Sequence, residues 1–243
     1  MPVTNAEYGT RIDEISDNIY RISTPIPPNP AMPAGFSFNQ FLVLDDEPLL
    51  FHTGMRRLFP LVSEAVATVM PLAKLRWLSF SHHECDEDGA LREWLNAAPE
   101  AAPVCGQLQS MLSIDLDDRT PRVLADGETI EIGKRRLRWF DTPHLPHGWD
   151  AGYLFETTTR TLFCGDLFTQ AGATHDPVSE GDILGPSEAM RAQMDYYSNP
   201  RAAGPAIERL ATAEPALLAC MHGTAFRGDG AAMLKELARA LAK

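Results

Sequence analysis

The stretch Ser81–Gly89, which reads SHHECDEDG, determines how the rest of the chain is interpreted. It follows an apolar run, Leu75–Phe80 (LRWLSF), whose length and aromatic content predict a buried strand. It precedes a helix-like segment, Ala90–Leu95. Two histidines and four acidic residues therefore lie on a loop between a strand end and a helix start. Such a density of acidic groups repels itself unless a cation lies among them, so a metal site is preferred to a solvated acidic turn.

The order His-x-Glu-x-Asp at His82, Glu84 and Asp86 strengthens the metal interpretation. Alternate residues of an extended segment point to the same side, so these three side chains are expected to converge. Imidazole and carboxylate are both common ligands of divalent metals. We therefore expect a metal site whose remaining ligands come from elsewhere in the chain.

Composition is that of an ordinary soluble globular protein of 243 residues, with 44% hydrophobic and 22% charged residues. The net charge of −12 argues against a nucleic-acid or anionic-membrane partner. The N-terminus lacks the pattern of a secretory signal, and no apolar run approaches the ~20 residues needed to span a bilayer. We expect a cytoplasmic location and a single domain over residues 1–243. The cysteines lack CxxC spacing and are expected to be free thiols: Cys85, Cys105, Cys164 and Cys220.

Hydrophobic periodicity predicts an alternation of strands and helices along the whole chain. Besides Leu75–Phe80, strands are expected at Arg11–Ser16, Asn18–Ser23, Phe36–Leu44, Pro48–Phe51, Thr129–Gly133, Arg136–Phe140, Gly152–Glu156, Thr161–Cys164 and Leu217–Met221. Besides Ala90–Leu95, helices are expected at Leu58–Val69, Ser187–Met194, Ala206–Ala213 and Ala231–Lys243, with a short strand and a helix inside Pro103–Leu116. This order predicts an α/β (α+β) fold, in which two mixed sheets pack face to face under outer helices.

Three further ligand candidates follow strand ends. His147 follows the strand that contains RRLRWF, Asp166 follows an apolar strand in LFCGDLF, and His222 follows another in ACMHG. A carboxylate in such an apolar setting is costly without a partner. Strand ends on one edge of a sheet can share a cleft, so these residues are expected to join the loop ligands. The remaining histidines are interpreted as hydrogen-bonded structural residues: His83, His144 and His175.

Together these motifs resemble the metallo-β-lactamase superfamily, and within it the diiron domain of flavodiiron proteins and their stand-alone oxygen-binding relatives. The zinc hydrolases carry His-x-His-x-Asp-His on this loop, whereas Glu84 replaces the second histidine here, as in the diiron group. His147–Asp150 (HGWD) resembles the H-W-P-D of that group, and Tyr196–Asn199 (YYSN) resembles a YYAN stretch near its substrate pocket. The resemblance spans about Asn18–Gly223.

The resemblance implies an αββα sandwich and a dinuclear iron site. One iron would be held by His82, Glu84 and His147, and a second by Asp86 and His222, with Asp166 as the bridging carboxylate. It also implies that Tyr196 and Tyr197 are catalytic residues. Independently of the resemblance, three histidines with three carboxylates favour iron or manganese over zinc. The expected cofactor is two iron ions, with manganese or zinc as the alternative metals.

Two positions depart from the family pattern. The motif continues with histidine after the aspartate, but this chain has Glu87. Either Glu87 replaces that ligand, or it points to solvent and leaves the second metal with an open position. Where the superfamily has aspartate, the segment LFHTG places His52. His52 either orients a ligand or is a core histidine.

The functional prediction is binding or reduction of O₂ or NO. Neither G-x-G-x-x-G nor G-x-x-x-x-G-K-[ST] occurs, so no FMN is expected in this chain and electrons would come from a separate donor protein or thiol. A homodimer is also considered. Two alternatives remain: a dinuclear hydrolase of a thioester, lactone or phosphoester, and a degenerate scaffold whose second metal position is empty because of Glu87.

Overall fold

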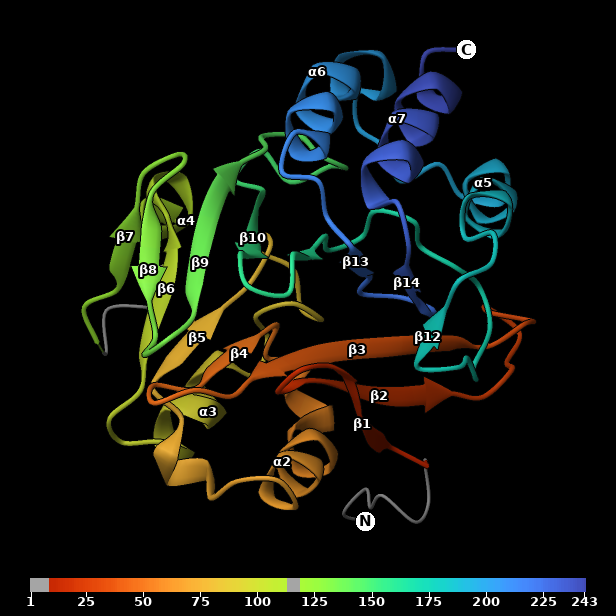
Figure 1. The fold of residues 1–243 in the computed structure, drawn as a ribbon. Coiled ribbons are helices and arrows are strands. Elements are labelled where there is room, and N and C mark those ends of the chain that lie inside the picture. The colour runs from red at the N-terminus through yellow and green to blue at the C-terminus, as the bar shows by residue number, and fades with distance from the viewer. Residues whose placement is uncertain (1–8, 113–118) are drawn as a thin grey trace.

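Two mixed sheets lie face to face with helices on their outer sides in the computed structural model, which describes residues 9–112 and 119–243 (Figure 1). Helices α2 and α3 lie outside the first sheet, and α5, α6 and α7 lie beyond the second (Figure 1). The predicted αββα sandwich is therefore confirmed. In the described residues, no helix is both long enough and apolar enough to span a membrane.

The first sheet has seven strands in the order of the chain, antiparallel from β1 to β4 and parallel from β4 to β7. They are β1 (Arg11–Ser16), β2 (Ile19–Ile26), β3 (Phe36–Val43), β4 (Leu49–Phe51), β5 (Trp77–Ser79), β6 (Ala102–Gly106) and β7 (Arg122–Leu124).

The second sheet has the order β12-β14-β13-β11-β10-β9-β8, in which β11 pairs with β13 in parallel. Its strands are β8 (Thr129–Glu131), β9 (Arg136–Asp141), β10 (Gly152–Glu156), β11 (Thr161–Phe163), β12 (Val178–Ser179), β13 (Leu217–Ala219) and β14 (Ala225–Arg227). The described helices are η1 (Arg56–Leu58), α2 (Phe59–Ala67), η2 (Leu72–Lys74), α3 (Leu91–Ala97), α4 (Gln107–Leu112), α5 (Leu184–Gln193), α6 (Pro200–Ala211) and α7 (Gly230–Leu241).

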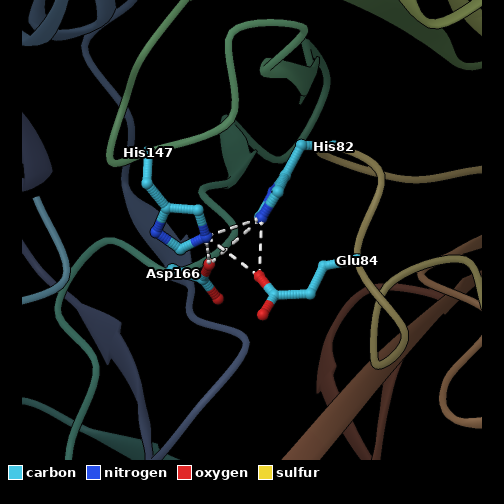
Figure 2. Close-up of side chains that lie close together, drawn as sticks. All are labelled: His82, Glu84, His147 and Asp166. Atoms are coloured by element: carbon cyan, nitrogen blue, oxygen red, sulfur yellow. Dashed lines mark hydrogen bonds and ion pairs between the residues drawn. The ribbon is translucent and has the colours of Figure 1, made fainter. Parts of the chain in front are cut away.

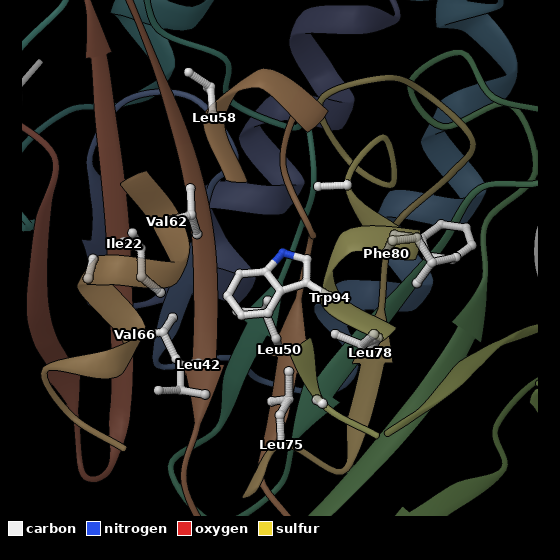
Figure 3. Close-up of a cluster of buried hydrophobic side chains, with 14 of the residues drawn as sticks. Ile22, Leu42, Leu50, Leu58, Val62, Val66, Leu75, Leu78, Phe80 and Trp94 are labelled. Atoms are coloured by element: carbon white, nitrogen blue, oxygen red, sulfur yellow. The ribbon is translucent and has the colours of Figure 1, made fainter. Parts of the chain in front are cut away.

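Three apolar clusters hold these layers together. One lies between the first sheet and its helices, where Trp94 of α3 is fully buried against Leu50 and Leu78 (Figure 3). A second lies between the second sheet and α5–α7. The third fills the space between the sheets, where Phe41 and Phe51 contact Phe163 with ring centroids 5.7 and 5.3 Å apart. A strand such as β3 is buried on both faces because both of its faces meet apolar layers.

Most predicted elements are present with shifted ends. Helix α6 begins at Pro200 instead of Ala206, because Asn199 caps it by accepting a hydrogen bond from the Ala202 amide and Pro200 suits the first helical position. Helix α5 likewise begins at Leu184. The short strands β7, β12 and β14 were not predicted. The helix expected within Pro103–Leu116 is α4, and its last predicted residues lie outside the described ranges.

Candidate metal centre

Four strand ends deliver the predicted ligands to one place. The loop Ser81–Gly89 follows β5, Asp166 follows β11, His222 follows β13, and His147 lies on the loop between β9 and β10. The first loop is expected from its sequence to be extended, and this is wrong. The Glu87 and Asp88 amides both donate to the Glu84 carbonyl, at 3.1 and 3.0 Å, so a helical turn brings the side chains together.

The first half of the site combines two imidazoles and two carboxylates (Figure 2). The Nε2 atoms of His82 and His147 are 2.9 Å apart, and each lies within 3.0 Å of Oε2 of Glu84. Oδ2 of Asp166 lies 3.6 Å from both nitrogens. Two imidazole nitrogens facing each other at this distance, with carboxylate oxygens beside them, form the donor set of a divalent metal.

The second half shares Asp166 through its other oxygen. Oδ1 of Asp166 lies 3.2 Å from Nε2 of His222, which is itself 3.5 Å from Oδ2 of Asp86. Asp166 is 5% exposed, and no hydrogen bond is made to its Oδ1 among the described residues. This buried carboxylate therefore presents one oxygen to each half of the site.

Glu87 lies within the cluster and not in solvent. Its side chain is fully buried, and apart from the neighbouring Asp86 carboxylate neither of its oxygens has a hydrogen-bond partner among the described residues. Its carboxylate groups with those of Glu84 and Asp86, with one oxygen of each within 4.8 Å of the others. The alternative in which Glu87 points to solvent is therefore wrong.

Each histidine of the site is oriented through the nitrogen that faces away from it. Nδ1 of His147 lies 2.9 Å from the Tyr196 carbonyl, and Nδ1 of His222 lies 2.9 Å from the Ser37 carbonyl. Because a carbonyl can only accept, both Nδ1 atoms carry the proton and leave Nε2 free to ligate. These partners were missed by sequence reasoning, since any residue type can supply a main-chain carbonyl.

His52 acts on the third histidine through a serine. Nε2 of His52 lies 3.1 Å from Oγ of Ser81, and the same Oγ lies 3.0 Å from Nδ1 of His82. Complete burial lowers the pKa of His52 to about 3, so this ring is neutral. The orienting role, and not the purely apolar core role, is therefore the one that the contacts support.

The pKa shifts in the site are those of a cluster of negative charges that bound cations would neutralise. A hydrogen bond with His147, then one with His82, lowers the pKa of Glu84 to about 2. The same bond to Glu84 raises the pKa of His147 to about 9. Burial, and then the negative charges of Asp166 and Asp86, raise the pKa of Glu87 well above its usual value. In the metal-free site, protons on these residues therefore supply the positive charge that bound metals would supply. The donor set fits a pair of metal ions.

The histidines assigned structural roles stay outside the ligand groups. His83 bonds to Asp88 and, through Nε2, lies 3.1 Å from the Gln109 carbonyl. His175 lies 3.1 Å from the Gly172 carbonyl through its own Nε2, and His144 is exposed. Asp150, from the HGWD segment, accepts from the His83 amide at 2.9 Å and so fastens the His147 loop to the His82 loop.

The two tyrosines differ in position. The Tyr196 hydroxyl lies 3.2 Å from Oγ of Ser187, and burial raises its pKa to about 12. Tyr197 is 5% exposed and packs in the apolar cluster beneath α5–α7. The Tyr196 carbonyl contacts the ligand His147, so this segment has a positioning role whether or not its hydroxyls take part in chemistry.

Known proteins with similar sequences include an oxygen oxidoreductase and a nitric oxide reductase by name. Rubredoxin-oxygen oxidoreductase of Megalodesulfovibrio gigas is 30% identical over 81% of this chain and 50% of its own length. The anaerobic nitric oxide reductase flavorubredoxin of Salmonella arizonae is 26% identical over 68% of this chain and 35% of its own. The chain thus spans half or less of these relatives' length.

Solved structures agree on the fold. Rubredoxin oxygen:oxidoreductase from Desulfovibrio gigas has a TM-score of 0.81 at 22% identity, covering 95% of this chain and 61% of its own. A fragment of a diflavin flavoprotein from Nostoc sp. has a TM-score of 0.79 at 16% identity, covering 96% of both chains. The family model described as "ODP family beta lactamase" matches residues 36–223. The chain therefore belongs to the ODP family of β-lactamase-like proteins.

Proposed function

We propose that this chain is a dinuclear iron protein that binds or reduces O₂ or NO with electrons from a separate donor. His82, Glu84 and His147 would hold one iron, and Asp86, Glu87 and His222 the other, with Asp166 between them. Two ferrous ions held there would supply electrons to a bound diatomic molecule. Manganese or zinc is the alternative metal content.

The observation that carries the proposal is the two-sided placement of Asp166. Its Oδ2 faces His82 and His147 at 3.6 Å, while its Oδ1 faces His222 at 3.2 Å. A single buried carboxylate serving both halves supports a pair of metals over one isolated ion. Glu84 supports iron over zinc, because a carboxylate where a zinc hydrolase has imidazole makes the donor set harder.

Surrounding side chains restrict what can reach the site. Phe36 stacks on the His222 ring at 4.4 Å between centroids, and Phe38 contacts the same ring edge-on at 5.3 Å. Both phenylalanines are buried. Apolar rings beside one ligand exclude water while admitting a small neutral molecule, as binding of O₂ or NO requires.

Of the two candidate catalytic tyrosines, Tyr196 is the better supported. Among the charges that raise its pKa is that of Asp166, whereas Asp166 is not among those acting on Tyr197. We assign Tyr196 the role of hydrogen-bond donor to a ligand of the metals, and Tyr197 the wall behind it. A phenol that stays protonated is suited to donate, because burial keeps its pKa far above neutral.

We also propose that residues 1–243 act as one domain and that the electron donor is a different protein. The relatives named rubredoxin-oxygen oxidoreductase and flavorubredoxin support a donor of the rubredoxin or flavin type. A homodimer is the assembly we propose to test alongside the donor.

The test is metal analysis followed by gas consumption. Protein purified anaerobically without added metal should contain two irons per chain and develop visible absorption in air. With a chemical reductant and mediator, it should consume O₂ or NO, and Tyr196→Phe should slow this while the iron content stays the same. The matched control is Tyr8→Phe, which removes a phenol far along the sequence from every proposed ligand.

A hydrolytic activity would overturn the proposal. Colourless protein containing zinc, with kcat/KM on the order of 10⁴ M⁻¹s⁻¹ or more towards a lactone, thioester, phosphoester or β-lactam, would identify a metallohydrolase. Metal content of one ion per chain would instead support a site with an empty second half.

A further inference from the structure

The two halves of the site differ in their donors, and Glu87 is responsible for the difference. In the first half, two imidazoles meet Glu84 and Asp166. In the second, a single imidazole, His222, faces Asp166 and Asp86 at 3.2 and 3.5 Å, and the Glu87 carboxylate groups with those of Asp86 and Glu84. The donor set is thus nitrogen-rich on one side and oxygen-rich on the other.

Glu87 is held in this place by its main chain. Its carbonyl accepts from the Thr53 amide at 2.6 Å and from the Thr53 hydroxyl at 3.2 Å, and its amide donates to the Glu84 carbonyl at 3.1 Å. These bonds fix the Cα, so the short side chain remains within the cluster. Both of its oxygens are buried, and apart from the neighbouring Asp86 carboxylate neither has a hydrogen-bond partner among the described residues. A group buried in this way requires a ligand, and its other close neighbours are carboxylates, so the ligand is a cation.

Adding Glu87 changes the charge balance of the pair. With Glu87 ligating, Glu84, Asp86, Glu87 and Asp166 together offer four negative charges to two divalent ions, so the loaded site is neutral. Dinuclear carboxylate sites of this kind in helical bundles hold either iron or manganese. Oxygen donors suit Mn²⁺, whereas imidazole favours Fe²⁺ and the later metals. Replacing an imidazole ligand by a carboxylate therefore reduces the difference in binding affinity between Fe²⁺ and Mn²⁺.

We propose that Glu87 makes the second half of the site a manganese-competent position, so that this chain can hold a mixed iron–manganese pair. The inference rests on the proposed function for the existence of the dinuclear site, but it concerns which metal each half selects. Site selection by donor type requires no change in the first half, where His82 and His147 retain an iron-type environment.

The experiment is anaerobic competition on the metal-free full chain with equimolar Fe²⁺ and Mn²⁺. We expect about one iron and one manganese per chain by elemental analysis, and an electron paramagnetic resonance signal of Mn²⁺ coupled to a second metal. Glu87→His should lower the manganese content at least about tenfold, since even residues outside the ligand set change metal affinity by 10–100-fold. Glu87→Gln, which keeps the shape but removes the charge, should weaken the second metal of either kind.

Glu64→His is the matched control, because it makes the same substitution at an exposed position of α2, outside the site. It should leave both the iron and the manganese content unchanged. Exclusion of manganese by the wild-type chain, or an unchanged iron-to-manganese ratio in Glu87→His, would overturn the inference. If a mixed pair forms but neither O₂ nor NO is consumed, the proposed function fails and the inference stands. If an all-iron chain consumes them, the reverse holds.

Discussion

Asp166 contributes a different oxygen to each half of the site, whereas His222 faces only one half. Asp166→Ala should therefore lose both metals, and His222→Ala should lose mainly the second. Metal content after dialysis, measured by elemental analysis, distinguishes the two variants. His175→Ala is the control, because the ring of this half-buried histidine bonds to the Gly172 carbonyl, away from the proposed ligands, and its loss should leave both metals in place. Equal metal loss in Asp166→Ala and His222→Ala would contradict the bridging assignment.

His52 reaches His82 through a hydrogen bond to Ser81, which makes its role separable from that of a ligand. His52→Ala should weaken the first metal by about 10–100-fold, the usual cost of removing a group that orients a ligand. The second metal should keep its affinity, because His222 is oriented by the Ser37 carbonyl instead. Ser81→Ala should reproduce the effect, and the double variant should add little, since both changes break one chain of contacts. Additive losses would mean that His52 acts by another route.

At the scale of elements, the loop carrying His147 packs directly on the loop carrying His82. A Cβ added at Gly148 would lie 2.7 Å from the His82 Cβ, closer than side chains pack. Gly148→Ala should therefore displace His82 and release metal while the sheets stay folded. Gly204→Ala in α6 is the control, because nothing lies within 4 Å of the added atom. That change should stabilise the helix by about 0.5–1 kcal/mol. Metal titration measures the affinity of each variant, and thermal unfolding measures its stability. An unchanged metal affinity in Gly148→Ala would show that the two loops move apart without displacing His82.

Long elements could be predicted from sequence because their periodicity reports burial. Strand β3 and helices α2 and α7 carry enough apolar positions to define a face, and they match the prediction. Strands β12 and β14 contain two and three residues, too few for any period, and were missed. The metal loop is the instructive case. Its candidate ligands do converge, but not because the loop is extended, as the sequence analysis assumed. Main-chain hydrogen bonds to the Glu84 carbonyl make the loop a turn, and residue type does not reveal such bonds.

At the scale of the whole molecule, the convergence of the candidate ligands could be predicted because topology returns strand ends to one edge. His82, Asp166 and His222 each follow a strand, so their convergence required only the correct sheet order. The burial of Glu87 could not be predicted, because an acidic residue in an acidic loop is normally solvated. Its position depends on Thr53 at the end of β4, which is remote in sequence.

The concentration of carboxylates also sets how stability should respond to pH without metal. Burial raises the pKa of Glu87 and of Asp86, so the folded state favours their protonated forms. A raised pKa contributes stability that is complete below the unfolded value, about 4 for these groups, and is lost as the pH rises. His147, with its pKa raised to about 9, loses its contribution to stability as the pH rises from its unfolded value of about 6.5 to about 9. Glu84 and His52 act oppositely. The contribution of Glu84, with a pKa of about 2, is already complete at pH 5, and that of His52, whose pKa burial lowers to about 3, is complete above its unfolded value of about 6.5.

Metal-free protein should therefore become less stable from pH 7 to pH 8.5, while metal-loaded protein should not. Bound cations take the place of the protons, and their affinity increases as protons leave the ligands. The difference in Tm between loaded and metal-free protein should accordingly widen across this range, as thermal unfolding at several pH values would show. Glu87→Gln cannot ionise, so it should flatten the metal-free curve. A gap that stays constant, or a metal-free protein that is more stable at pH 8.5 than at pH 7, would mean that these carboxylates do not share the charge of one buried site.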